Sequence, residues 1–344
     1  MERAQGSMKT EKTGRRPARR LLFFSLVCAV CLTGCGKDSG EWEKSVIEEQ
    51  IVIQGISGEY DLLFLTDSHV VSLGEAAENG RAQTENGEAQ AGTGAQDEES
   101  RRQEYAASRY EGFCGQDGTS SQEMFAQAMD YAREEGVDGV LLGGDIIDSP
   151  SQENLTFLSE ELSTLSMPYL YTPGNHDWTY PWEYMTSKGK QEYLPMLSPY
   201  MGGNTAFHTL DFGEFVVAAV DNSSGQVNPE ALEEYEEVLD QGKPVIVLAH
   251  VPFLTQSVLA KAREVWNGGV VIGGGNFGGI YPDETSQEFL EMTTASDSPV
   301  VAVLAGHVHF YDKDVIEGEK DVPQIVGDAL FHGSALRLRI TGRG

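Results

Sequence analysis

The sequence predicts an α/β protein built from layers of sheet and helix. Short runs of apolar residues recur along the chain, and helix-like stretches lie between several of them. Strands that are buried on both faces read as nearly continuous apolar runs, and their alternation with helical stretches is typical of layered α/β folds. The chain has 344 residues, of which 40% are hydrophobic, so it can bury a sizeable core.

The predicted strands extend from residue 51 to the end of the chain. Ordered structure is expected to begin at Ile51, and residues 60–66 (YDLLFLT) form the first long apolar run. The alternating pattern over residues 335–340 predicts a closing antiparallel strand. The other predicted strands are 137–142, 168–171, 215–220, 245–249 and 300–305.

Helical patterns occupy the intervals between several of these strands. Ser120 and Glu123 match a capping box, and apolar residues at helical spacing follow them. A second helix is expected to start near Ser149 and Pro150, with leucines on one face. Further helices are predicted near 228–241, 255–266 and 283–295.

The first 34 residues differ from the rest and are predicted to be a lipoprotein signal peptide. A basic flank of four arginines precedes an apolar run over residues 21–32, which is shorter than an ordinary membrane span. Residues 32–35 (LTGC) resemble a bacterial lipobox, which implies cleavage before Cys35 and lipidation of that cysteine. The expected location is the outer face of the cell membrane. The alternative is a short uncleaved anchor helix.

The remaining chain is expected to hold one domain over residues 50–342, preceded by a polar tether over residues 35–49. Residues 74–104 contain no Val, Ile, Leu, Met, Phe or Trp, so they are predicted to be a disordered insertion. After removal of the signal peptide and lipidation of Cys35, Cys114 is the remaining cysteine, which excludes an intrachain disulfide.

The charge of the chain restricts its partners. The formal net charge is −30, which argues against a nucleic-acid binding surface, because phosphate backbones are bound by Lys and Arg. A protein this acidic that handles a phosphorylated substrate needs a local positive centre. Bound metal ions can supply that centre.

Polar residues follow five of the predicted strands directly, and they include five of the seven histidines. Ligands of α/β sheets bind beyond the carboxyl ends of the strands, so these segments are expected to form one site. The segments are Asp67-Ser68-His69, Gly144-Asp145, Gly174-Asn175-His176-Asp177, His250 and Gly306-His307-Val308-His309.

This order of motifs (D-x-H, G-D, G-N-H-D, H, G-H-x-H) resembles the calcineurin-like metallophosphoesterase superfamily. The motifs span residues 67–309, and their combination is far more specific than any one of them. The resemblance implies mixed β-sheets in a sandwich flanked by helices, a four-layer αββα arrangement. It also implies two metal ions at the edge of the sheets.

The resemblance assigns seven metal ligands. Asp145 would bridge the two ions, while the other ligands divide into one set of Asp67, His69 and His309 and another of Asn175, His250 and His307. A turn permitted by Gly306 is expected to direct His307 and His309 to different metals. Oxygen and imidazole ligands suit Mn, Fe, Zn, Co or Ni and do not select among them.

The resemblance also implies the chemistry. A hydroxide activated by two metals would attack phosphorus, and the cations would balance charge on the phosphoryl oxygens. His176 would contact the substrate and assist departure of the leaving oxygen, and Asp177 would orient the imidazole. An alternative for Asp177 is helix capping. Asp148 is expected to cap the following helix, and the alternative is that it supports the residues of the site.

One departure from the superfamily's protein phosphatases narrows the substrate. Those enzymes carry a phosphate-clamping arginine shortly after the G-D motif, and residues 144–150 (GDIIDSP) contain none. We therefore expect a membrane-tethered hydrolase of small phosphate mono- or diesters. The alternatives are a phosphodiesterase that acts on lipid or cell-wall phosphodiesters and a binding lipoprotein that uses metals without catalysis. The sequence does not indicate the oligomeric state.

Overall fold

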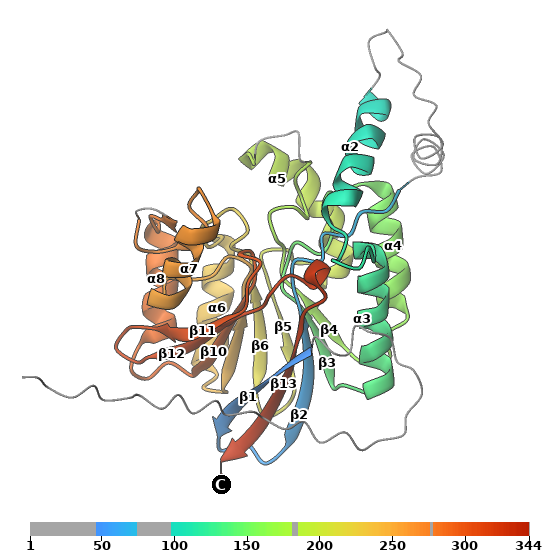
Figure 1. Ribbon diagram of the computed structural model, residues 1–344. Helices are drawn as coiled ribbons and strands as arrows, with labels where there is room; N and C mark the ends of the chain where they lie inside the picture. The colour runs from blue at the N-terminus through green and yellow to red at the C-terminus, as the bar shows by residue number, and fades with distance from the viewer. Residues whose placement is uncertain (1–45, 74–97, 181–184, 276–277, 344) are drawn as a thin grey trace, which may run out of the picture. The chain divides into compact units, whose positions relative to one another are not determined.

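Two β-sheets pack face to face in the computed structural model, and helices cover their outer faces (Figure 1). The structure describes residues 46–73, 98–180, 185–275 and 278–343. The predicted signal peptide, Cys35 and the first part of the predicted tether lie outside these residues. Residues 74–97 of the predicted insertion also lie outside them. None of the helices in the described ranges is long and apolar enough to span a membrane.

The first sheet contains both the first and the last strand of the domain. Its central strand β2 pairs in parallel with β3 and antiparallel with β13. The antiparallel pairing confirms the predicted closing strand. In sheet order the strands are β1 (Val46–Gln54), β13 (Ala335–Arg343), β2 (Glu59–Leu65), β3 (Gly139–Leu142) and β4 (Tyr169–Tyr171).

The second sheet has a parallel centre of four strands and an antiparallel strand at each edge. A separate two-stranded sheet pairs β8 (Val271–Ile272) with β9 (Gly279–Ile280). In order, the strands of the large sheet are β11 (Asp312–Ile316), β12 (Val322–Val326), β10 (Val300–Ala305), β7 (Val245–Leu248), β6 (Val216–Val220) and β5 (Phe207–Asp211).

Alternate residues of the central strands face two different cores. In β2, Leu62 and Phe64 pack against the second sheet, whereas Leu63 and Leu65 pack against helices. Side chains of a strand alternate between the faces of its sheet, so a strand covered on both sides must be apolar throughout. This arrangement explains why residues 60–66 show no polar alternation.

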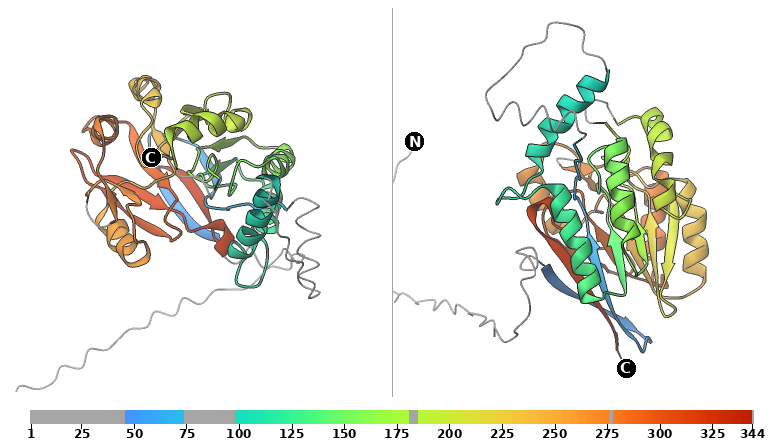
Figure 2. Two further views of the ribbon diagram at one scale, coloured as in Figure 1. Left: turned by 90° about the horizontal axis from the view of Figure 1, so that it is seen from above. Right: turned by 90° about the vertical axis from the view of Figure 1, so that its right-hand side faces the viewer.

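Helices on the outer faces complete the predicted four layers (Figure 2). The first sheet is covered by α3 (Ser121–Glu135) and α4 (Gln152–Ser163), and the second by α6 (Glu230–Asp240) and α8 (Glu284–Thr294). The αββα prediction is therefore confirmed. The remaining helices are α2 (Glu98–Gly112), α5 (Ser187–Tyr193) and α7 (Gln256–Val265), with 3₁₀ turns η2 (Leu194–Tyr200) and η3 (Leu330–His332).

The helix starts follow local capping rules. Ser120 and Glu123 form the predicted capping box of α3: the Ser120 side chain accepts from the Glu123 amide, and the Glu123 carboxylate accepts from the Ser120 amide. Helix α4 is capped by Ser151, whose side chain accepts from the amide of Asn154. Asp148 therefore does not cap this helix, contrary to the sequence-based expectation.

Two elements extend beyond the boundaries predicted from the sequence. Strand β1 begins at Val46, so residues 46–49 belong to the first sheet and not to the tether. Its polar side chains are tolerated because, within the described ranges, β1 is an edge strand that pairs with β13 alone. Helix α2 begins at Glu98, so it includes residues 98–104 of the predicted insertion. Glu, Arg, Gln and Ala all have high helix propensity, so they can form a helix that carries no apolar residues. A search for apolar periodicity does not detect such a helix.

Candidate metal centre and active site

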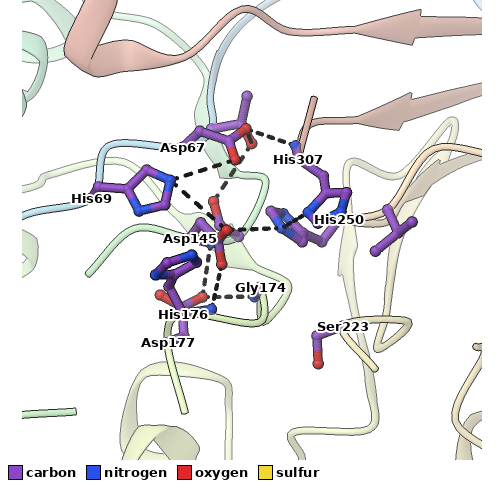
Figure 3. Close-up of polar contacts among 12 residues, drawn as sticks. Asp67, His69, Asp145, Gly174, His176, Asp177, Ser223, His250 and His307 are labelled. Carbon is purple, nitrogen blue, oxygen red and sulfur yellow. Dashed lines mark hydrogen bonds and ion pairs between the residues drawn. The ribbon is translucent and has the colours of Figure 1, made fainter. Parts of the chain in front are cut away.

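All five predicted motif segments meet at one edge of the two sheets (Figure 3). The segments after β2, β3 and β4 come from the first sheet, and those after β7 and β10 come from the second. Strands β2, β3 and β4 are parallel to one another, as are β7 and β10. Parallel strands bring their carboxyl ends together, and the sandwich then joins the two sets of strand ends into one site.

The backbone at this edge is strained at the candidate ligands. Among the described residues, five that are not glycine have a positive φ, and all five are predicted metal ligands. Such conformations cost of order 1–3 kcal/mol each and are concentrated at functional sites. His307 and His309 therefore follow β10 in a bent segment, as expected from Gly306. The five residues are Asp67, His69, Asp145, His307 and His309.

Two motif glycines are required by close approach. A Cβ at Gly174 would collide with the backbone and carboxylate of Asp145. A Cβ at Gly306 would collide with the side chains of Thr66 and Asp67. In both places a side chain would displace a predicted ligand, so the glycines let the strand ends come together.

The first set of predicted ligands converges at one side of the site. Nε2 of His309 lies 3.4 Å from Oδ1 of Asp67 and 3.2 Å from Nε2 of His69. Ligand atoms of these three residues all lie within 4.8 Å of one another. Three buried or half-buried donors at this spacing could hold one metal ion.

His250 and His307 of the second set converge beside the first set. Nε2 of His250 lies 3.2 Å from Oδ2 of Asp145 and 3.2 Å from Nδ1 of His307. The same Asp145 oxygen lies 3.8 Å from Nε2 of His69. Asp145 thus contacts both sets, which is the position expected for a bridging carboxylate.

Unsatisfied buried atoms show that the residues fit bound cations. Oδ1 of Asp67 and Oδ1 of Asn175 are buried and have no hydrogen-bond partner within the described part of the chain. Buried acceptors of this kind are costly unless something satisfies them. Nδ1 of His250 lies 2.8 Å from the carbonyl oxygen of Gly143, to which it can donate, so Nε2 is free to bind a metal.

Burial and neighbouring charges set the protonation of the ligands. Burial lowers the pKa of His69 to about 4 and that of His307 to about 3. Burial also raises the pKa of Asp67, but His309 and His250 outweigh this effect and bring it to about 2. These groups are therefore neutral imidazoles and a carboxylate at neutral pH, the forms that bind metals. Burial opposes protonation of His250, but Asp145 and Asp67 raise its pKa to about 9, so a metal ion bound at Nε2 would displace a proton from it.

His176 lies beside the ligands and is held by Asp148. Nδ1 of His176 is 3.0 Å from Oδ1 of Asp148, and the His176 amide donates to Asp145 at 2.7 Å. The His176 side chain is 28% exposed, whereas Asp148 is 3% exposed. Burial lowers the pKa of His176, but the charges of Asp145 and Asp148 outweigh it and raise the pKa. The imidazole is thus charged more readily than usual and is open to a substrate.

The expected contact between Asp177 and His176 is not found. The carboxylate of Asp177 faces four backbone amides, which donate to it at 2.7–3.0 Å. These amides lie in the turn that carries Asp145 and at Gly174, so Asp177 organises the loops that present the ligands. The donors are the N–H groups of Asp145, Ile146, Ile147 and Gly174.

Asn222 also supports the site, although it was not among the predicted site residues. Its Oδ1 accepts from the amides of His250 at 3.0 Å and Val251 at 2.9 Å, and its Nδ2 donates to the Val251 carbonyl at 2.7 Å. The signal that marks the other motifs also applies here, because Asp221 and Asn222 directly follow β6.

Comparisons with known proteins agree with this geometry. The sequence model of the family described as calcineurin-like phosphoesterase matches residues 61–311. No curated protein sequence matches the chain at a significant level.

Three solved structures similar to this chain are metal-dependent or hydrolytic enzymes by their titles. A dimetal phosphatase from Danio rerio has 13% identity and a TM-score of 0.44, covering 79% of this chain and 88% of that chain. Purple acid phosphatase PPD1 from yellow lupin (Lupinus luteus) has 14% identity and a TM-score of 0.47, and the match covers 83% of this chain and 46% of that chain. Phosphopantetheinyl hydrolase from Mycobacterium tuberculosis has 12% identity and a TM-score of 0.40, and the match covers 80% of this chain and 92% of that chain.

The family match covers every motif from Asp67 to His309 and well over half of the chain. The chain therefore belongs to the calcineurin-like phosphoesterase family.

Proposed function

We propose that this protein is a metal-dependent phosphoesterase that hydrolyses phosphate monoesters or diesters in small substrates. The observation that carries the proposal is the convergence of two ligand sets that share Asp145, with His176 beside them. A site that only bound metal for stability would not need a half-buried imidazole, held by a buried carboxylate, at the edge of the ligands.

The side chains divide the chemistry between them. Bound divalent cations would supply Lewis acidity towards the phosphoryl oxygens and lower the pKa of water. Asp145 contacts both ligand sets and so couples the two positions. His176 uses Nδ1 for Asp148, which leaves Nε2 to donate a hydrogen bond or proton to the leaving oxygen.

We propose that the ions are drawn from Mn, Fe, Zn, Co and Ni. The described ligand set contains imidazole, carboxylate and one amide oxygen, and it contains no thiolate. Such ligands accept all five metals. The identity would be read by elemental analysis of protein purified without chelators.

We further propose that the enzyme is anchored by lipid at Cys35 on the outer face of the cell membrane. The support is the basic flank, the short apolar run and the LTGC motif at residues 32–35. Expression of the full chain in a bacterial host with labelled palmitate should label the wild type and not Cys35→Ala. Equal labelling of both would contradict the anchor.

A lipid or cell-wall phosphodiester is the second candidate substrate, and the predicted anchor is the feature that favours it. An anchored enzyme meets such substrates at the surface where it resides. Comparing hydrolysis of p-nitrophenyl phosphate with that of its bis ester, and then with phosphodiester lipids in vesicles, separates the two candidates.

The central test uses purified protein supplemented with Mn²⁺. The wild type should hydrolyse p-nitrophenyl phosphate or bis(p-nitrophenyl) phosphate, and Asp145→Asn should lose at least about 10²-fold in kcat. Asp130→Asn is a matched control on the exposed surface of α3. Equal rates for wild type and Asp145→Asn would place the activity elsewhere. Bound metal without activity on any ester would favour the non-catalytic alternative.

A further inference from the structure

We propose that Arg109 of helix α2 is a positioning residue of the proposed phosphoesterase reaction. It holds the Asp148 carboxylate, which in turn holds the imidazole of His176. The inference rests on the proposed function and deepens it, because it assigns α2 to the active site. No motif of the sequence points to this helix.

Arg109 binds the Asp148 carboxylate through two parallel hydrogen bonds. Its Nε donates to Oδ2 at 2.8 Å, and its Nη2 donates to Oδ1 at 2.6 Å. A bidentate arginine–carboxylate pair fixes orientation as well as distance, which a lysine cannot reproduce. The Arg109 side chain is 27% exposed and that of Asp148 is 3% exposed, so the pair is shielded from water on one side.

The same Asp148 oxygen serves the catalytic edge. Oδ1 of Asp148 lies 3.0 Å from Nδ1 of His176 and 3.4 Å from Nδ1 of His69. Burial raises the pKa of Asp148, but Arg109, His176 and His69 outweigh it and lower the pKa. Without Arg109, the buried Asp148 carboxylate would contact only the imidazoles of His176 and His69. Nothing would then fix the orientation of the carboxylate plane.

The end of α2 is itself fixed against the site. The ring of Phe113, just beyond the helix, stacks on the ring of His69 with centroids 4.3 Å apart and an angle of 6°. The guanidinium carbon of Arg109 lies 4.4 Å from the centroid of the Phe113 ring. Phe113 is buried with Val71, Ala329 and Phe331. Arg109 therefore acts from a packed position and not from a free surface.

This geometry predicts a particular kinetic defect. His176 assists the leaving oxygen, so loosening it should slow the step in which that oxygen departs. Misplacing a catalytic group by about 1 Å can cost about 10²-fold in rate. The loss should be larger for phenyl phosphate than for p-nitrophenyl phosphate, because phenolate is the poorer leaving group and needs more help. KM should change little, since Arg109 is not assigned a contact with substrate.

The test compares Arg109→Ala and Arg109→Lys with the wild-type enzyme, and all three proteins are loaded with Mn²⁺. We expect kcat for phenyl phosphate to fall about 10- to 100-fold in Arg109→Ala, with KM within about twofold and metal content unchanged. Added guanidinium should restore part of the loss in Arg109→Ala. Arg133→Ala is the matched control, because Arg133 is 30% exposed and pairs with Asp130, both on helix α3 and away from the site.

A double-mutant cycle with His176→Ala decides whether Arg109 acts through that imidazole. Arg109→Ala should have almost no further effect in the His176→Ala background. Additive losses would overturn the proposal, as would wild-type kinetics in Arg109→Ala. If the wild type itself is inactive on all esters, the proposed function fails first.

A measurement that does not depend on turnover is the NMR signal of the His176 ring N–H, recorded on ¹⁵N-histidine-labelled protein without substrate. A signal that disappears in His176→Ala identifies it. That signal should also disappear or shift in Arg109→Ala and stay in place in Arg133→Ala. An unchanged signal in Arg109→Ala would contradict the positioning role even if activity falls.

Discussion

Oδ1 of Asp148 lies 3.0 Å from Nδ1 of His176, 28 residues away in sequence, whereas the neighbouring Asp177 faces backbone amides. The two carboxylates therefore have different tasks. Asp148 orients an imidazole that is open to substrate, and Asp177 organises the loops that carry the ligands. A carboxylate next to a histidine in sequence need not be its partner in space.

Asp177→Ala should destabilise the domain by about 3–5 kcal/mol, because it leaves four backbone amides without their acceptor. Urea unfolding of the metal-free protein measures this change. Asp130→Ala, at an exposed position, should change stability by less than about 1 kcal/mol. Normal stability in Asp177→Ala, with a loss confined to kcat, would show that Asp177 acts on His176 instead.

Asn222→Ala should weaken binding of one metal ion by about tenfold or more, because residues that support a ligand tune its affinity. Asn222 fixes the backbone at His250 through three hydrogen bonds. Metal titration against a competing chelator measures the affinity. Asn204→Ala is a close control, since Oδ1 of Asn204 also accepts from two backbone amides but lies outside the site. Equal metal affinities in wild type and Asn222→Ala would refute this role.

Lys190→Met should cost about 3 kcal/mol of stability, because it leaves a buried carboxylate without its cation. Nζ of Lys190 lies 2.7 Å from Oδ2 of Asp221, whose side chain is fully buried. Lys243→Met removes a comparable pair, Lys243 with Asp211, in which the carboxylate is 55% exposed. That control should lose less than about 1 kcal/mol. Similar losses in the two variants would contradict the role of burial.

His208 should make stability fall as the pH drops from about 6.5 to about 4. Burial lowers its pKa in the folded state to about 4, whereas an unfolded histidine titrates near 6.5. Between these values the unfolded chain binds more protons, so the contribution is complete above pH 6.5 and is lost as pH falls through 4.

The effect of His208 is at most about 2 kcal/mol after allowance for its partial exposure. His208→Gln and His208→Phe should both show a shallower decline than the wild type in denaturant unfolding at a series of pH values. Parallel curves for all three proteins would show that His208 does not carry this dependence.

The layered fold and the site edge were predictable because they depend on local patterns. Residues 60–66 had to be apolar on both faces, and the ligand types stand directly after the strands, where parallel strands bring them together. Asn222 carries the same signal after β6, but its role depends on a contact with a different strand end.

Arg109 was not predictable in the same way, and the sequence left open whether Asp148 caps a helix or supports the site. The first part of helix α2, residues 98–104, resembles a disordered segment in sequence, and the place of the helix against His69 is fixed by the packing of Phe113. The pairing of Arg109 with Asp148 joins residues 39 apart in the chain. No local pattern records such a contact. The start of β1 was misplaced for a related reason, since its pairing partner lies at the other end of the chain.

The position of β13 between β1 and β2 has a consequence for folding of the protein. Among the described residues β1 pairs with β13 alone, so β1 gains its hydrogen-bonding neighbour only when the far end of the domain has joined the sheet. Pairing over such a sequence separation is slow and exposes strand edges to aggregation in the meantime. Chains truncated before residue 335 should therefore be open to proteolysis, whereas the full chain can close the sheet.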